Sequence, residues 1–101
     1  MIIHQRKIGY GEKYPEFFAA LAKAKAYIEK KHPEISVELM YNLAGERRRV
    51  TILTRYASLA DYERIDADMD NDEAYSKIME SVISDKVLPI VDQFYRAIGS
   101  A

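Results

Sequence analysis

His4 is the residue of this chain best suited to acid–base chemistry, because it is the only histidine in a segment expected to form a strand. An imidazole titrates near neutral pH, so His4 could act as a general base. The alternative is a structural role, in which the ring forms a hydrogen bond at a strand or dimer surface. The second histidine, His32, precedes Pro33 at the end of an expected helix, where it would stabilise the helix dipole.

The pattern of possible metal ligands does not favour a metal site. The chain has two histidines without i,i+4 spacing and no cysteine, which makes a transition-metal site improbable. Asp66, Asp68 and Asp70 have the spacing of the first three ligands of a calcium loop, but Asn71 stands at its glycine position and Lys77 at its last glutamate position. We therefore interpret this run as acidic caps between two helices, and we expect neither a metal nor a cofactor.

Tyrosines and nearby polar residues supply the candidates for ligand binding. Eight tyrosines are many for 101 residues, and most are expected in the core or at its rim, with a hydroxyl in contact with water. Some of them could instead line the entrance of a pocket, together with an amide and a guanidinium group beside an apolar cavity. The predicted ligand-binding residues are Tyr10, Tyr41, Asn42, Arg55 and Tyr56.

Composition predicts one small globular domain over residues 1–101 and disfavours several kinds of partner. Apolar residues make up 49% of the chain and charged residues 31%, as in ordinary globular proteins. The net charge of −1 provides no field that would attract nucleic acid or an anionic membrane. No apolar run approaches the ~18 residues of a membrane span, and the N-terminus becomes charged too early for a signal peptide. A cytoplasmic location is expected.

Hydrophobic patterning predicts the element order β-α-β-β-α-α-β. The longest helix should begin near Pro15 and end before Pro33, and shorter helices should begin at Ser58 and within 70–73. The last segment could be a strand or a helix, and we predict a strand because the pattern lacks only a closing strand. The strands are expected at residues 1–8, 35–43, 47–56 and 90–98.

An antiparallel sheet covered by helices on one face leaves its other face bare. Alternation along the second and third strands assigns Met40 and Leu53 to that bare face, among the polar residues Glu38 and Thr51. Apolar side chains among polar ones suit an interface, and a twofold homodimer is the commonest arrangement. The alternative is an ordinary exposed face with two stray hydrophobic residues.

The whole layout resembles that of the dimeric α+β-barrel proteins, which have a ferredoxin-like β-α-β-β-α-(α)-β fold. It is most similar to the NIPSNAP-like and antibiotic-biosynthesis-monooxygenase-like groups, in which a strand ends in an aromatic residue and a Ser-Leu-x-x-Tyr/Phe turn begins the next helix. The segments that carry this resemblance are Tyr14-Pro-Glu-Phe-Phe, Arg55-Tyr-Ala-Ser-Leu-Ala-Asp-Tyr-Glu and the acidic step Asp72-Glu73. The resemblance implies a four-stranded antiparallel sheet and a homodimer whose sheets face each other, sometimes enclosing a pocket for a small, often aromatic molecule.

Three functions remain open at this point. The first is a cofactor-free monooxygenase or isomerase, and the second is a non-catalytic dimeric binding or interaction module, in which the same face serves only assembly. The third, haem binding, is implied by distant members of the superfamily, but it would leave His4 as the sole axial ligand in a chain without tryptophan. The first two share a homodimer that binds a small hydrophobic or aromatic ligand between sheet and helices, and this is the function that we predict.

Overall fold

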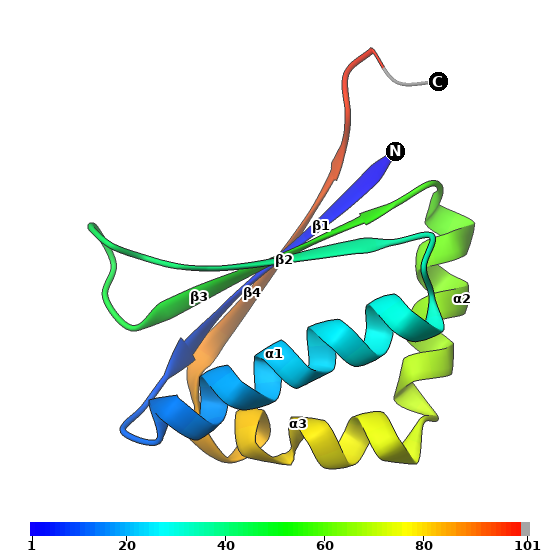
Figure 1. The fold of residues 1–101 in the computed structure, drawn as a ribbon. Helices are drawn as coiled ribbons and strands as arrows, with labels where there is room; N and C mark the ends of the chain where they lie inside the picture. Colours follow the sequence, from blue (N-terminus) through cyan, green and yellow to red (C-terminus); the bar gives the residue numbers. More distant parts are fainter. Residues whose placement is uncertain (100–101) are drawn as a thin grey trace.

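Seven elements follow one another in the computed structural model, which describes residues 1–99 (Figure 1). They are β1 (Ile2–Tyr10), α1 (Tyr14–Lys31), β2 (Ser36–Tyr41), β3 (Arg49–Tyr56), α2 (Leu59–Asp70), α3 (Glu73–Asp85) and β4 (Lys86–Arg96). The predicted element order is confirmed, and the closing segment is a strand. None of the helices in the described residues is long and apolar enough to cross a membrane.

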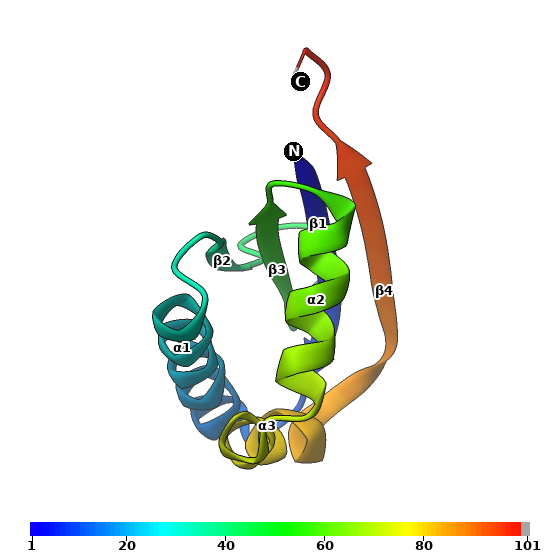
Figure 2. The ribbon, with the colours of Figure 1, turned by 90° about the vertical axis from the view of Figure 1, so that its right-hand side faces the viewer.

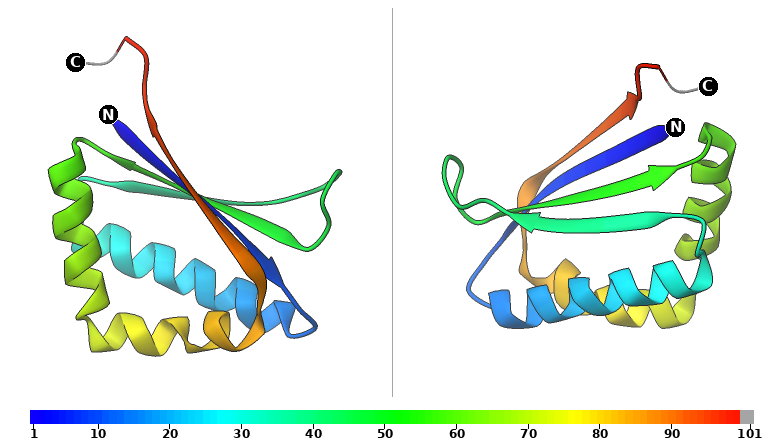
Figure 3. Two further views of the ribbon diagram at one scale, coloured as in Figure 1. Left: turned by 180° about the vertical axis from the view of Figure 1, so that it is seen from behind. Right: turned by 45° about the horizontal axis from the view of Figure 1, so that its top comes forward.

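The four strands form one antiparallel sheet in the order β2-β3-β1-β4. All the helices lie on one side of this sheet, with α1 and α3 below it and α2 across one end (Figures 1 and 2). The views from behind and from above show the same arrangement, with the opposite face of the sheet uncovered (Figure 3). The α+β ferredoxin-like fold with helices on one face is therefore confirmed.

The helices begin where the capping residues predict. Pro15 lies in the first turn of α1, where its missing N–H removes no intrahelical hydrogen bond. Ser58 is the N-cap of α2, because its hydroxyl accepts a hydrogen bond from the backbone N–H of Asp61 at 3.2 Å. Asp72 caps α3 in the same way, because its carboxylate accepts from the N–H of Tyr75 at 3.0 Å. The acidic run is thus the junction of two helices, as interpreted from the sequence.

The hairpin between β2 and β3 is longer than predicted. The strands were expected to continue to Leu43 and to resume at Arg47, but β2 ends at Tyr41 and β3 begins at Arg49. The side-chain amide of Asn42 donates to the carbonyl of Glu46 at 2.7 Å, and this bond closes the loop before Leu43 can pair. The sheet also extends further than expected at Gly9, which pairs with Arg49 of β3 and Val87 of β4. The approach of β4 is close, since a Cβ at Gly9 would lie 2.9 Å from the carbonyl oxygen of Val87.

The core fills the space between the sheet and the helices in two clusters. One cluster contains Tyr56 of β3 together with Ile65 and Met69 of α2. The other contains Phe17 of α1 and Val82 of α3, which pack against β1 and β3. Residues of both clusters also line a cavity in the same layer.

Candidate functional site

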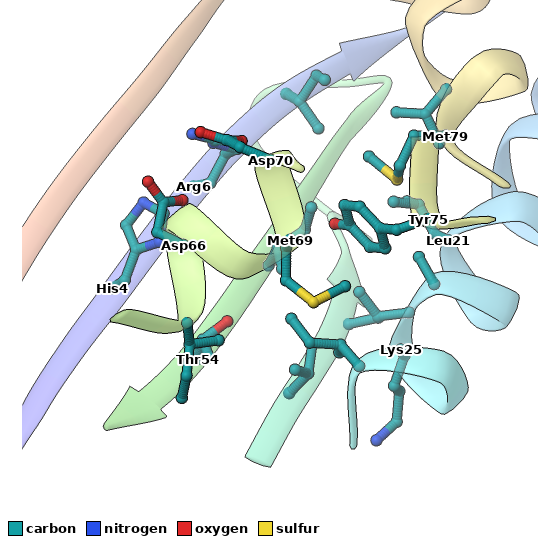
Figure 4. A pocket seen from close by; sticks show the side chains of 18 of the residues that line it. His4, Arg6, Leu21, Lys25, Thr54, Asp66, Met69, Asp70, Tyr75 and Met79 are labelled. Carbon is teal, nitrogen blue, oxygen red and sulfur yellow. The ribbon is translucent and has the colours of Figure 1, made fainter. Parts of the chain in front are cut away.

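A cavity of about 380 Å³ lies between the helix-covered face of the sheet and the three helices. Its volume falls in the range typical of small-molecule sites. Most of its wall is apolar and comes from every layer of the fold, including Leu21, Ala24, Ile52, Ile65, Met69 and Met79. In the close-up, Met69 and Tyr75 occupy its centre (Figure 4).

Four ionisable side chains gather at one end of this cavity. His4 and Arg6 of β1 lie there with Asp66 and Asp70 of α2, while Leu21 lies at the far end with Met79 and Lys25 (Figure 4). His4 and Arg6 point to the same face because side chains alternate along a strand. Asp66 and Asp70 lie one turn apart on α2, so they share one side of that helix.

A carboxylate on β4 contacts both His4 and Arg6. Asp92 lies opposite Arg6 in the sheet, and its Oδ1 accepts from Nε of Arg6 at 2.7 Å while its Oδ2 accepts from the guanidinium at 3.2 Å. The same Oδ1 lies 2.9 Å from Nε2 of His4. The hydrogen bond from Arg6 is the main cause that lowers the pKa of Asp92, although partial burial opposes it. Asp92 is therefore a carboxylate at neutral pH.

The ring of His4 is packed between aromatic side chains. It stacks on Phe94, with centroids 4.5 Å apart and planes 9° from parallel. Tyr62 approaches with its ring edge-on at 5.8 Å. The side chain of His4 is only 12% exposed, so its ring orientation is fixed by the packing on both sides.

One buried and one half-buried tyrosine also line the cavity. Burial, followed by the charge of Asp66, raises the pKa of Tyr56 to about 12. Burial also raises the pKa of Tyr75, which projects into the centre of the cavity (Figure 4). Both hydroxyls therefore remain protonated at neutral pH and can donate a hydrogen bond to a ligand oxygen.

Of the residues that the sequence suggested for ligand binding or catalysis, His4 and Tyr56 line the cavity. Tyr10 packs against Phe17 and Phe18 in the second core cluster. The remaining three residues lie elsewhere. Tyr41 is 60% exposed at the end of β2, Asn42 lies in the hairpin loop, and Arg55 forms an ion pair with Glu38 on the uncovered face of the sheet.

Sequence reasoning missed four residues of the site, namely Arg6, Asp66, Asp70 and Asp92. A signal existed for Arg6, because it follows His4 by two positions in a strand and must share its face. Asp92 could not be assigned, since its segment was ambiguous between strand and helix. Asp66 and Asp70 were considered as calcium ligands and interpreted as acidic caps, but both lie within α2 and line the cavity.

The predicted interface residues form a compact group on the uncovered face. Glu38 of β2 pairs with Leu53 of β3, and two residues further along, on the same face, Met40 pairs with Thr51. The side chain of Met40 is exposed at 43%. The structure thus brings these four residues together on one face, as the alternation predicted.

Comparison with known proteins gives the class of fold. No protein-family model matches the sequence, and no curated protein does. Solved structures match it over nearly the whole chain. An uncharacterised NIPSNAP domain protein from Burkholderia xenovorans has a TM-score of 0.81 at 12% identity, with 100% of this chain and 98% of that chain covered.

Two further matches carry the names of oxygenases. A candidate antibiotic biosynthesis monooxygenase from Nitrosomonas europaea has a TM-score of 0.77 at 13% identity, over 97% of this chain and 99% of that chain. A mutant of SnoaB, a cofactor-independent oxygenase from Streptomyces nogalater, has a TM-score of 0.72 at 11% identity, over 98% of this chain and 94% of that chain. At such identities the likeness establishes the NIPSNAP-like and monooxygenase-like fold and no activity.

Proposed function

We propose that this chain forms a homodimer that binds a small apolar or aromatic molecule in the cavity between its sheet and helices. The observation that carries the proposal is a cavity of about 380 Å³ with largely apolar walls and a cluster of four ionisable side chains at one end. Such a site would bury the hydrophobic body of a ligand and fix its direction through a few polar contacts.

The expected affinity follows from the area that a ligand would bury. An aromatic ring system that loses about 200 Å² of apolar surface to the cavity gains about 5 kcal/mol. Before the entropy cost of association is subtracted, this free energy corresponds to a Kd of about 0.2 mM, so the probe must be used at millimolar concentration. Hydrogen bonds at the polar end would add to it, so a natural ligand should bind more tightly than a bare aromatic probe.

The dimer is proposed from the uncovered face of the sheet. That face carries Met40 and Leu53 beside polar residues, a mixture that suits an interface with trapped polar groups. The resemblance to dimeric α+β-barrel proteins supports the same arrangement. A second copy seated there would leave the cavity on the helix side of each sheet.

Binding can be tested by calorimetry with 2-naphthol as the probe. Ala24 of α1 lines the cavity, whereas Ala26 is exposed on the same helix. The variant Ala24→Leu should fill the cavity and weaken binding by at least tenfold, and the matched control Ala26→Leu should bind as the wild type does. Absence of binding heat for the wild type at millimolar probe would contradict the proposal and favour a non-catalytic interaction module.

A second candidate function is catalysis without a cofactor, of the monooxygenase or isomerase type. The specific observation in its favour is a histidine held by a carboxylate at the polar end of the cavity. The likeness to SnoaB adds only a shared fold.

A further inference from the structure

We propose that His4 and Asp92 form a general-base pair, in which Nδ1 of His4 removes a proton from an uncharged, enolisable carbonyl compound bound in the cavity. This inference rests on the proposed binding of a small ligand and adds the reaction and the substrate class. His4 is the catalytic residue, and Asp92 and Arg6 are positioning residues.

The hydrogen bond between the two side chains decides which nitrogen is free. Asp92 is a carboxylate and can only accept, so Nε2 of His4 must carry the proton of their 2.9 Å hydrogen bond. In the neutral ring, Nδ1 then has the lone pair. The structure gives Nδ1 no hydrogen-bond partner within residues 1–99. No side-chain nitrogen or oxygen in that range is both buried and unpaired, so Nδ1 must have surface open to water or to a ligand. Nδ1 is therefore an accessible base.

The surroundings fix this base in place. Arg6 holds Asp92 through both carboxylate oxygens, and Phe94 and Tyr62 pack against the imidazole from two directions. A base that needs no reorientation after the substrate binds loses less entropy in the transition state. The imidazolium formed after proton transfer would still donate from Nε2 to Asp92, and the carboxylate would stabilise its charge.

The proposed step needs no other reactant. The C–H bond next to the carbonyl breaks, its proton passes to Nδ1, and its electron pair moves into the enolate with the charge on oxygen. A protonated tyrosine hydroxyl, from Tyr56 or Tyr75, is available at the cavity wall to donate to that oxygen. The proton on Nδ1 can exchange with solvent before a solvent-derived proton returns to the same carbon, which gives hydrogen exchange. Return to another carbon of a conjugated system gives isomerisation.

The charges at the polar end disfavour an anionic substrate. Asp66 and Asp70 line this end, and neither forms an ion pair within the described residues. A ligand carboxylate would meet their negative charges, and the nearby guanidinium of Arg6 is already paired with Asp92. A neutral ketone avoids this repulsion, and its carbonyl requires only a hydrogen-bond donor.

The test uses 2-tetralone, a neutral bicyclic ketone, in D₂O, with loss of its C1–H signal followed by NMR. The wild type should accelerate exchange, and His4→Gln should lower the catalysed rate by about 10²–10⁴ with an unchanged Kd for the ketone. Free imidazole should restore part of the rate to His4→Ala. The matched control His32→Gln alters a histidine that does not line the cavity, and it should exchange as the wild type does.

The hydrogen bond between Asp92 and His4 can be tested separately. Asp92→Asn should lower the exchange rate without a change in Kd, and Asp92→Glu should restore part of it, whereas a purely structural role would alter stability alone. The ¹⁵N shifts of His4 in the wild type should show a proton on Nε2, which requires no variant to fold. A proton on Nδ1, or equal exchange by wild type and His4→Gln with the ketone bound, would overturn the general-base inference. If 2-tetralone does not bind at all, both the general-base inference and the proposed ligand-binding function are contradicted.

Discussion

Asp85 accepts a hydrogen bond from the backbone N–H of Gly11, 74 positions earlier in the chain, at 3.1 Å. The other carboxylate oxygen accepts from the N–H of Lys13, also at 3.1 Å. Asp85 is the last residue of α3 and is only 8% exposed. The buried carboxylate of Asp85 thus links the turn between β1 and α1 by hydrogen bonds to the junction of α3 and β4.

The first prediction follows from this contact. Replacing Asp85 with Ala removes the charged acceptor of the Lys13 N–H and one of two acceptors of the Gly11 N–H, which also donates to the backbone carbonyl of residue 85. The free energy of unfolding should therefore fall by about 1–3 kcal/mol, since hydrogen bonds to a charged group are lost. Asp85→Asn keeps one acceptor oxygen and should lose less. Urea denaturation measures both, and an unchanged midpoint for Asp85→Ala would show that the turn does not depend on this carboxylate.

Stability in acid should depend on Asp72. Its carboxylate accepts from Lys31 at 2.7 Å, from the hydroxyl of Tyr27 at 2.6 Å and from the backbone of Tyr75 at 3.0 Å. Lys31 is the main cause that holds the pKa of Asp72 well below its usual range, followed by Tyr27. A depressed pKa in the folded state stabilises the protein above the ordinary aspartate pKa of about 3.9 and loses this effect as the pH falls.

Thermal melting between pH 7 and pH 2 tests this contribution. The melting temperature of the wild type should fall steeply below about pH 4. Asp72→Asn should lower it at pH 7 and flatten the fall, because the amide can still cap α3 but has no charge for Lys31. Glu63→Gln, at an exposed position on α2, is the control. A variant curve parallel to that of the wild type would argue against this origin of the acid sensitivity.

The oligomeric state tests the uncovered face of the sheet. Light scattering at micromolar concentration should report twice the chain mass of 11.7 kDa. Leu53→Arg places a charge without a partner in a partly apolar interface and should shift the mass toward that of one chain. Leu59→Arg introduces the same charge on α2, away from the sheet, and should leave the dimer intact. A monomeric wild type would contradict the proposed homodimer.

Most of the fold could be predicted because local patterns agree with the tertiary structure. The alternation Val50, Ile52, Thr54 and Tyr56 marks the helix-covered face of β3, and Ser58 marks the start of α2. The hairpin was predicted too short because its end is set by the side chain of Asn42, whose bond to Glu46 replaces strand pairing. A side-chain bond of this kind leaves no periodic signal.

The site was harder to predict because it is assembled from distant segments. His4 was recognised from its residue type, but its partner Asp92 lies 88 positions away on the strand whose pattern was weakest. Arg55 is on the face opposite the cavity, and the alternation of β3 already assigned it there. Tyrosine content alone did not separate the tyrosines that line the cavity from the others. The alternation of β3 assigned Tyr56 to the helix-covered face, and the sheet register pairs it there with Ile2.

The most direct test of the proposed binding site uses the four methionines as reporters. Met69 and Met79 line the cavity, whereas Met1 and Met40 do not. With ¹³C-labelled methionine methyl groups, saturating 2-naphthol should shift the Met69 and Met79 signals and give intermolecular NOEs to both, with Met1 and Met40 unchanged. Shifts confined to Met1 or Met40, or no shift at millimolar 2-naphthol, would contradict the claim that the cavity binds a small aromatic molecule.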